Sequence, residues 1–247
     1  MSNINDTYFE GHYKQIWKTI IPSELTIKET DFMMQYFNLQ QGDCILDLMC
    51  GYGRHAFALA KKGMKVTAVD NLPDYIEEIN QSVITENLSV NTVLGNVIEF
   101  IPVGQYDLVL CMGNSLQFFN QEELIKLLNT ISSHLKPSGN FLINTWSITE
   151  IAVKHFKEKS WNTFEDLKFL TDSKFLFCPN RIETETQIIA PDGTTEIKES
   201  IDYIWSLNEM EAMFRESGMK TKEVFSIPGK KKFSIGEPRA YIVVEKI

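Results

Sequence analysis

A chain of 247 residues with 43% hydrophobic content can bury the core of one large domain, or of a core with a small appended unit. The formal net charge of −9, with no basic run longer than the lysines of residues 230–232, argues against nucleic acid or an anionic membrane as a partner. The first residues are polar, and no stretch approaches the ~20 apolar residues of a membrane span, so we expect a cytoplasmic protein. We also expect it to be a monomer or a homodimer.

Cysteine and histidine spacing gives no sign of a metal site. The four cysteines include no C-x-x-C pair, and the four histidines form no H-x-x-x-H pair. We therefore expect buried thiols, with no metal and no disulfide.

A strand, a glycine turn and a helix open the regular part of the chain. Residues 44–49 form an apolar run typical of a buried parallel strand, and residues 53–62 carry the apolar stripe of a helix that ends at Gly63. Residues 65–70 then predict a second strand, and Pro73 opens a helix. This order predicts a βαβ unit.

The alternation continues to the last residues. Residues 91–97, 106–112, 141–145, 223–227 and 241–245 read as strands. A leucine-rich helix lies between the fourth and fifth strands, and the capping-box pair Ser206 and Glu209 predicts another helix. Alternating strands and helices predict a doubly wound, Rossmann-like α/β fold with a mostly parallel sheet covered on both faces.

One segment interrupts this alternation. Two extended stretches within residues 181–205 flank the turn-forming residues 190–193, which predicts a β-hairpin. We expect residues 148–206 to form a small antiparallel cap inserted into the core.

The stretch from Asp47 to His55 is the most informative for function. In an open α/β sheet, ligands bind beyond the carboxyl ends of the strands, and the glycines Gly51 and Gly53 allow a ligand to approach the backbone and the helix N-terminus. Asp70 ends the next strand, where its carboxylate can accept hydrogen bonds from a ribose diol. These residues predict a nucleoside site.

Two ligand classes compete for this site. Gly51, Gly53 and Ala56 also satisfy the G-x-G-x-x-A pattern of dinucleotide-binding proteins. Asp47, at the end of the first strand, suits a ligand that carries an ammonium and a sulfonium better than it suits a pyrophosphate.

In these residues the chain resembles the class I S-adenosylmethionine-dependent methyltransferases, close to the small-molecule branch typified by glycine N-methyltransferase and its bacterial relatives. The resemblance covers residues 29–147, in which Asp47, the glycine pair, Asp70 and Asn96 follow in the family's order. It implies a seven-stranded sheet whose last strand is antiparallel, and S-adenosylmethionine as the cofactor. Together with the insertion described above, we expect a core of residues 1–147 and 207–247 with an N-terminal helical lid, and a substrate cap at 148–206.

The resemblance carries a cofactor site over to this chain. The residues assigned to the cofactor are Asp47, Met49, Gly51, Gly53, Arg54, His55, Asp70, Asn71, Leu72, Asn96, Val97, Cys111 and Met112. Among them, Asp70 would bind the ribose, Asn96 and Val97 the adenine, and Cys111 and Met112 would pass beneath the ribose and the sulfonium. We further hypothesise that Arg54 pairs with the cofactor carboxylate.

Two positions depart from the family pattern. Met49 stands where many relatives have glycine, and we expect it to be tolerated because a strand end need not adopt positive φ. Asn96 stands where many have aspartate, and its carbonyl oxygen can still accept from the adenine amino group.

The acceptor site is expected after the fourth and fifth strands and beneath the aromatic N-terminal segment that contains Tyr8, Tyr13 and Trp17, which can add cation–π contacts to the sulfonium. The candidate substrate-binding residues are Tyr13, Asn114, Ser115, Phe118, Asn144 and Trp146. Gly113 to Leu116 lacks the Asn-Pro-Pro-aromatic sequence of nucleic-acid amino-methyltransferases, so we expect a small N or O acceptor. No residue is assigned as a catalytic base, because methyl transfer depends chiefly on positioning and charge.

Two other functions stay open at this point. The dinucleotide pattern allows an NAD(P)-dependent reductase, although the chain has no Tyr-x-x-x-Lys pair and no separate catalytic domain. The departures at Met49 and Asn96 allow a non-catalytic cofactor-binding protein.

Overall fold

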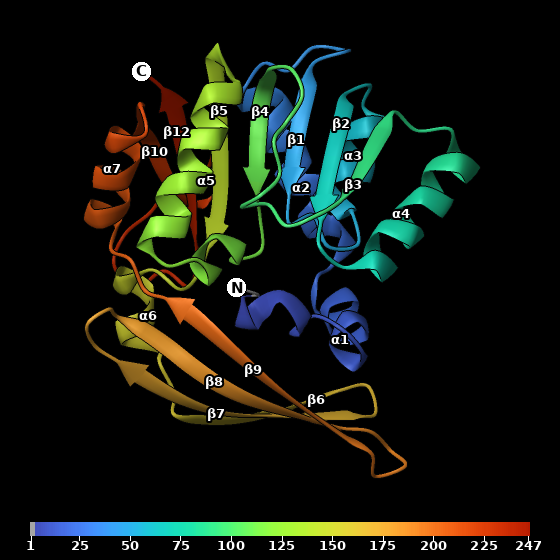
Figure 1. The fold of residues 1–247 in the computed structure, drawn as a ribbon, viewed down its shortest axis with the longest axis vertical. Helices are drawn as coiled ribbons and strands as arrows, with labels where there is room; N and C mark the ends of the chain where they lie inside the picture. Colours follow the sequence, from blue (N-terminus) through green and yellow to red (C-terminus); the bar gives the residue numbers. More distant parts are fainter. Residues whose placement is uncertain (1–2) are drawn as a thin grey trace.

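The computed structural model describes residues 3–247 and contains two sheets (Figure 1). An eight-stranded sheet with helices on both faces forms the core. A four-stranded antiparallel sheet lies beyond the carboxyl ends of the core's parallel strands, and the first helices lie between the two (Figure 1). The expected α/β core and antiparallel insertion are confirmed.

The core sheet has the strand order β11-β10-β12-β5-β4-β1-β2-β3. β1, β2, β3, β4 and β5 are mutually parallel where they pair, and β12 is antiparallel to both of its neighbours, as expected of the last strand. The strands are β1 (Cys44–Leu48), β2 (Lys65–Asp70), β3 (Val90–Leu94), β4 (Tyr106–Cys111), β5 (Leu135–Thr145), β10 (Met219–Ile227), β11 (Lys231–Lys232) and β12 (Ala240–Lys246).

Two details of this sheet differ from the expectation. The short edge strand β11 pairs with β10 and raises the expected seven strands to eight. β5 begins at Leu135 rather than at residue 141, because Leu135 already pairs with Tyr106 before a register shift in the ladder. Pro137 and Gly139 therefore lie within an irregular start of the strand.

Helices cover both faces of the core sheet. The helices are η1 (Ile4–Thr7), α1 (His12–Ile20), α2 (Ser23–Tyr36), α3 (Arg54–Lys61), α4 (Pro73–Glu86), η2 (Ser115–Phe118), α5 (Gln121–His134), α6 (Thr149–His155) and α7 (Leu207–Glu216). The expected capping box of α7 is present, since the Ser206 side chain accepts from the Glu209 amide and Glu209 accepts from the Ser206 amide.

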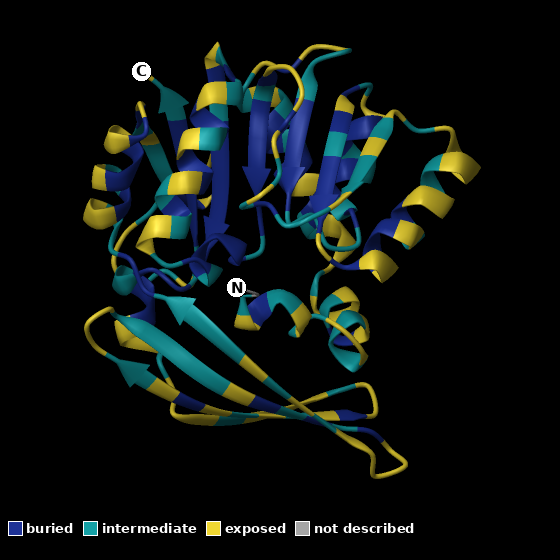
Figure 2. Ribbon diagram, viewed as in Figure 1, coloured by how far each residue is buried: buried dark blue, intermediate teal, exposed yellow. Residues whose placement is uncertain are grey.

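Burial is concentrated in the core sheet, whose central strands are covered on both sides (Figure 2). On one face α2 and α3 contribute Met33 and Leu59 to a cluster with the strands. On the other face α5 and α7 contribute Leu128 and Phe214. These two layers hold the carboxyl ends of β1, β2 and β4 in fixed positions.

The antiparallel sheet is larger than the single hairpin expected. Its order is β6-β7-β8-β9, with β6 (Lys159–Phe164), β7 (Leu167–Leu176), β8 (Arg181–Ile189) and β9 (Thr195–Tyr203). The predicted hairpin is β8-β9. β6 and β7 were not predicted, because most of their residues are polar or exposed and the alternation of apolar and polar residues that indicates a strand is weak.

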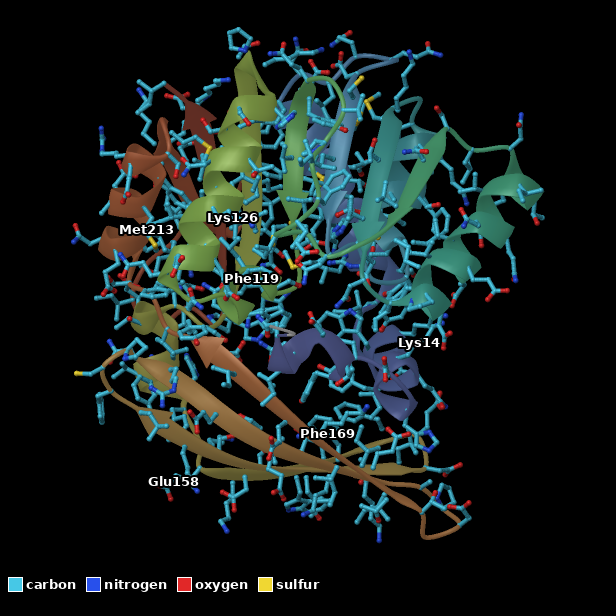
Figure 3. All side chains as sticks on the ribbon, viewed as in Figure 1. Lys14, Phe119, Lys126, Glu158, Phe169 and Met213 are labelled. Carbon is cyan, nitrogen blue, oxygen red and sulfur yellow. The ribbon has the colours of Figure 1, made fainter. Side chains whose placement is uncertain are left out.

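The antiparallel sheet is fixed to α1 by a small apolar cluster. Ile16 of α1 packs with Leu167, Ile188 and Ala190, and Tyr13 lies 6.0 Å from Phe169 between ring centroids. In Figure 3 Phe169 stands on the side of the sheet that faces the first helices. We call residues 148–206 the cap. Its inner face therefore lies toward the core.

Within residues 3–247, no helix is both long enough and apolar enough to cross a membrane. In the same part of the chain, no group of three or more histidine, cysteine or acidic side chains is arranged to hold a metal ion.

Candidate active site

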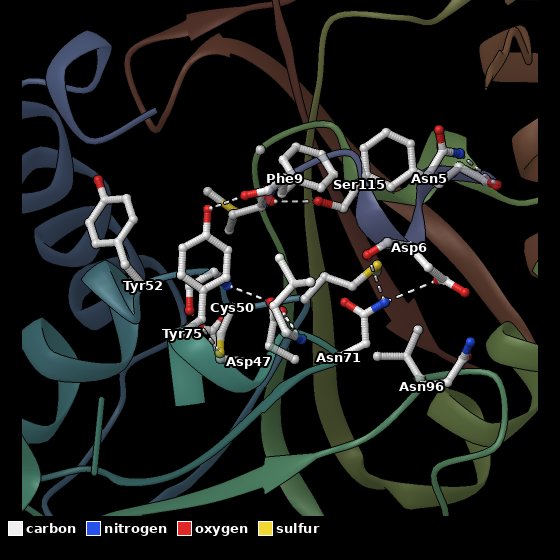
Figure 4. A pocket seen from close by; sticks show the side chains of 18 of the residues that line it. Asn5, Asp6, Phe9, Asp47, Cys50, Tyr52, Asn71, Tyr75, Asn96 and Ser115 are labelled. Carbon is white, nitrogen blue, oxygen red and sulfur yellow. Dashed lines mark hydrogen bonds between the residues drawn. The ribbon is translucent and has the colours of Figure 1, made fainter. Parts of the chain in front are cut away.

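A pocket of about 920 Å³, including its open mouth, lies at the carboxyl edge of the core sheet (Figure 4). Its walls come from the ends of β1, β2, β3 and β4 and from the first helices. The lining residues are Asn3, Asn5, Asp6, Phe9, Trp17, Asp47, Met49, Cys50, Gly51, Tyr52, Arg54, His55, Asp70, Asn71, Leu72, Tyr75, Gly95, Asn96, Val97, Met112, Gly113, Ser115, Phe118 and Phe119.

The two glycines of the turn have different roles. Gly51 has φ +56°, its amide donates to Oδ2 of Asp70 at 2.8 Å, and a Cβ added there would meet nothing within 4 Å. Gly53 has φ +78° and precedes the first residue of α3. A Cβ there would lie 2.9 Å from Cγ1 of Ile79. Gly51 thus leaves room for a ligand, whereas Gly53 is required for packing.

Replacing Gly53 with alanine should destabilise the fold by about 1–3 kcal/mol, because it adds a left-handed non-glycine residue and a contact with Ile79 that is too close. Gly51→Ala is the matched control: it has the same backbone strain without the packing contact. Urea unfolding of both variants measures the difference, and equal midpoints would contradict the packing role of Gly53.

Met49 corrects one expectation from the sequence. Its φ is +52°, in the left-handed region, although a strand-end residue was not expected to need positive φ. The chain turns at this position to begin the glycine loop, which gives a physical reason for glycine in relatives. Met49 still lines the pocket, and its side chain packs against the core.

Asp47 is a buried carboxylate with an unused oxygen. Its residue is 1% exposed, and Oδ2 has no hydrogen-bond partner. Burial raises the pKa of Asp47 to about 7. The positive charge of Arg54 opposes this rise, and the negative charge of Asp70 adds to it. A carboxylate in this state is suited to a ligand that brings its own positive charge.

Asp70 is oriented by the backbone. Its Oδ2 accepts from the Gly51 amide at 2.8 Å and its Oδ1 from the Leu72 amide at 3.0 Å. Each oxygen retains capacity for a second donor, which a pair of ribose hydroxyls can use. Burial raises the pKa of Asp70, and the backbone donors oppose that rise.

Arg54 and His55 belong to a buried network centred on Glu29 of α2. Oε2 of Glu29 accepts from Nη1 of Arg54 at 2.6 Å and lies 2.9 Å from Nε2 of His55, and Oε1 accepts from the Tyr241 hydroxyl at 2.6 Å. Burial lowers the pKa of His55, so its ring is neutral near pH 7 and Nε2–H donates. Arg54 is therefore already paired within the protein while it lines the pocket.

The adenine-side residues are also held by the protein. Oδ1 of Asn96 accepts from the Ile98 amide at 2.9 Å, so the oxygen expected to face the adenine amino group already has one donor. The Nδ2 atom of Asn96 is the other polar atom of this side chain that can bond to the adenine ring. Nδ2 of Asn71 donates to Oδ1 of Asp6 at 3.0 Å, which joins η1 to the end of β2 (Figure 4).

Several expected site residues do not line the pocket. They are Gly53, Cys111, Tyr13, Asn114, Asn144 and Trp146, together with Tyr8 of the aromatic segment. Cys111 is fully buried in the core, whereas Met112 is the β4-end residue that lines the pocket, so the placement of Cys111 beneath the ribose stays a prediction. Tyr13 packs between Tyr8 and Phe169 instead.

Asn114 joins loops. Its Oδ1 accepts from the Thr145 hydroxyl and from the amides of Trp146 and Ser147, at 2.9, 2.9 and 3.0 Å. It lies between β4 and η2 and has a left-handed φ of +71°. Asn144 donates its Nδ2 to the Ala240 carbonyl at 3.3 Å. These two amides fix the backbone behind the pocket.

Sequence reasoning missed the contributions of η1 and of Tyr52 and Tyr75 to the pocket lining. Asn3, Asn5, Asp6 and Phe9 line the pocket although they lie outside the segment that carried the family resemblance. The Asn3 and Asp6 capping box was a usable local signal for a helix start. Nothing local predicted that this helix would cover a strand-end crevice.

Comparison with known proteins agrees with this geometry. Residues 45–139 match the family described as "Methyltransferase domain". The ubiquinone biosynthesis O-methyltransferase of Rickettsia akari is 33% identical over 108 residues, which is 44% of this chain and 42% of that protein. The chain thus spans less than half of this curated relative.

Solved structures extend the likeness of fold to nearly the whole chain. A Clostridium acetobutylicum S-adenosylmethionine-dependent methyltransferase has a TM-score of 0.81 at 17% identity and covers 95% of this chain and 96% of its own. An amino pentose methyltransferase from Micromonospora echinaspora has a TM-score of 0.71 at 15% identity, over 96% of this chain and 98% of its own. Residues 45–139 thus match a methyltransferase-domain family, and nearly the whole chain has the fold of S-adenosylmethionine-dependent methyltransferases of known structure.

Proposed function

We propose that the protein transfers a methyl group from S-adenosylmethionine to a nitrogen or oxygen atom of a small diffusible molecule. The observation that carries this proposal is Asp47, a buried carboxylate with an unpartnered oxygen beside the glycine turn. A nicotinamide dinucleotide would bring phosphates to this turn, whereas the methionyl ammonium of S-adenosylmethionine brings the positive charge that Asp47 lacks.

The other lining residues fit the same cofactor. Asp70 offers two backbone-oriented oxygens to the ribose, and Leu72, Asn96 and Val97 would flank the adenine. Arg54 lies where the methionyl carboxylate would need a cation, although it must share its charge with Glu29. The bound cofactor supplies a methyl group activated by the sulfonium.

Aromatic side chains provide the region around that methyl group. Phe9, Trp17 and Phe118 line the pocket from η1, α1 and η2, and their ring faces can stabilise a sulfonium by cation–π contacts. Ser115 lies beside them, and its hydroxyl is 3.5 Å from the Met112 carbonyl. We propose that these residues exclude water and orient the acceptor.

The first helix works as a cover tied to both core and cap. Nδ2 of Asn3 donates to the Phe118 carbonyl at 2.9 Å. Asn5 makes a two-way pair with the Ile201 backbone, each bond 2.9 Å long. We propose that η1 closes over the cofactor and that the cap, residues 148–206, supplies the far side of the acceptor site.

The relatives support a small acceptor molecule that is methylated on either nitrogen or oxygen. Their printed names include an O-methyltransferase of ubiquinone biosynthesis and an amino pentose methyltransferase. The absence of nucleic-acid partners, the cytoplasmic location and the monomeric or homodimeric state expected from the sequence stay predictions.

Isothermal titration should show binding of S-adenosylmethionine and of its demethylated product with dissociation constants of roughly 1–100 μM, the range of ordinary enzyme substrates. NADH and NADPH titrated under the same conditions serve as the control. Saturation by a pyridine dinucleotide without binding of S-adenosylmethionine would overturn the proposal. Binding without methyl transfer to any member of an amine and alcohol panel would favour a non-catalytic role.

A further inference from the structure

Asp202 of β9 lies on the inner face of the cap. In the β8-β9 ladder it pairs with Ile182, and successive residues alternate, so Ser200 shares its face opposite Thr184. Further along this face of β8, Thr186 is fully buried and accepts or donates a hydrogen bond with the Tyr8 hydroxyl at 2.9 Å. Asp202 therefore faces the first helices and the core rather than the exterior.

The surroundings of Asp202 contain hydrogen-bonding groups but no paired cation. Its Oδ1 accepts from Nδ2 of Asn114 at 3.4 Å. Burial raises the pKa of Tyr8 and of Tyr13, and the negative charge of Asp202 adds to both rises. Within residues 3–247, no lysine, arginine or histidine nitrogen approaches this carboxylate within 4.0 Å. The nearest cation on the same strand face, Lys198, lies 3.7 Å from Glu196.

Asp202 is partly buried where the cap meets the core. Burial raises the pKa of Asp202 to about 7. The residue nevertheless keeps an intermediate share of accessible surface. Two neighbours place it beside the cofactor pocket: Asn5, which lines that pocket, pairs with the Ile201 backbone, and Asn114 lies between lining residues of the loop after β4.

Gln117 gives a second, independent sign of unused polar capacity at the same junction. It is fully buried in η2, and neither its Oε1 nor its Nε2 has a hydrogen-bond partner. η2 packs against β9, and it also carries Ser115 and Phe118, which line the cofactor pocket. Buried amides without partners are rare in native proteins and mark places where a ligand or water completes the bonding.

We propose that Asp202 anchors the methyl acceptor, and that this acceptor is a protonated amine rather than an alcohol. The proposal rests on the proposed methyltransferase function and selects between the two acceptor atoms left open there. The carboxylate pairs with the ammonium group as the acceptor enters. One proton then passes from the nitrogen to an Asp202 oxygen, which leaves a neutral amine with a free lone pair and a neutral carboxyl group.

The chemistry of the surroundings matches this role. An amine cannot act as a nucleophile while it is protonated, so an acceptor site needs a group that first attracts the cation and then takes its proton. The groups that face Asp202 are the phenols of Tyr8 and Tyr13 and the amide of Asn114, none of which carries charge near neutral pH. Among these groups, Asp202 is the one that can attract the ammonium group and then accept its proton.

The test compares a cation with its neutral counterpart on the whole protein. Cyclohexylammonium and cyclohexanol are titrated at pH 8 into protein saturated with S-adenosylhomocysteine, and binding is followed by ligand-observed NMR. Wild type should bind cyclohexylammonium at least about tenfold more tightly than cyclohexanol, and Asp202→Asn should reduce that preference to about twofold or less. The preference should fall as pH is lowered through about 7, where Asp202 becomes protonated.

Glu199→Gln is the matched control, because Glu199 lies on the same strand, on the opposite face, and is exposed. It should keep the wild-type preference. Equal binding of the two probes by wild type, no binding of either, or a preference retained by Asp202→Asn would each overturn the proposal. Failure to bind S-adenosylhomocysteine at all would instead overturn the methyltransferase function, so the two failures are distinguishable.

Discussion

Asp47→Asn should weaken S-adenosylmethionine binding by about a hundredfold while it makes the ligand-free protein more stable. The loss follows from removing a buried charge opposite the cofactor ammonium, an interaction of about 2–3 kcal/mol. The gain follows from the same burial, because the pKa of Asp47 is raised to about 7 and ionisation of the free protein is unfavourable. Titration calorimetry measures the first effect and urea unfolding the second.

The direction of the Asp47 pKa shift determines how the stability of the protein changes with pH. The folded pKa of Asp47 lies above the ordinary value of 3.8, so the wild-type stability associated with this group is complete below about pH 4 and is lost as pH rises through about 7. Asp47→Asn should remove that loss, with a gain of roughly 1–3 kcal/mol at pH 8. A variant that is less stable than wild type at pH 8 would contradict the account.

Asp166→Asn is the control for charge alone. Asp166 is exposed in the turn between β6 and β7, so its substitution makes the same change in net charge away from the pocket. It should leave both cofactor affinity and stability unchanged within about 0.5 kcal/mol. A loss of affinity in this variant would mean that the protein's overall charge, rather than Asp47, governs binding.

Much of the core could be predicted from the sequence because its signals are local. The apolar run before Asp47, the glycine turn and the acid that ends β2 are consecutive in the chain, and they specify a βαβ unit and its ligand-binding end. The hairpin β8-β9 was predictable for the same reason, since its turn contains Pro191 and Gly193.

The parts that escaped prediction depend on contacts between distant segments. Asn114 reads as an acceptor contact because of its place after β4, yet its amide holds the loop after β5, 31 to 33 residues away. Asp6 and Asn71 meet across 65 residues. Asp202 was not predicted because an acidic residue in a polar strand reads as solvated, whereas the β8-β9 pairing and the bond from Asn114 turn it toward the core.

Glu29→Gln should destabilise the protein by about 3–5 kcal/mol at pH 7, a larger effect on stability than any other substitution considered for this chain. Glu29 is 1% exposed and accepts hydrogen bonds from Arg54, His55 and Tyr241. The glutamine amide turns one acceptor into a donor and leaves the Arg54 guanidinium without its charge partner, which is costly inside a protein. Tyr241→Phe removes one donor only and should cost about 1 kcal/mol.

The pH profile of Glu29 should run opposite to that of Asp47. Burial alone would raise its pKa, but the hydrogen bond from His55, the charge of Arg54 and the hydrogen bond from Tyr241 lower the pKa of Glu29 to about 2, against an ordinary 4.5. Its stabilising contribution is therefore complete above about pH 4.5 and is lost as pH falls toward 2. Urea unfolding between pH 3 and 8 should show wild type and Glu29→Gln converging at the acid end, and a gap that stays constant across this range would show that Glu29 acts through its shape rather than its charge.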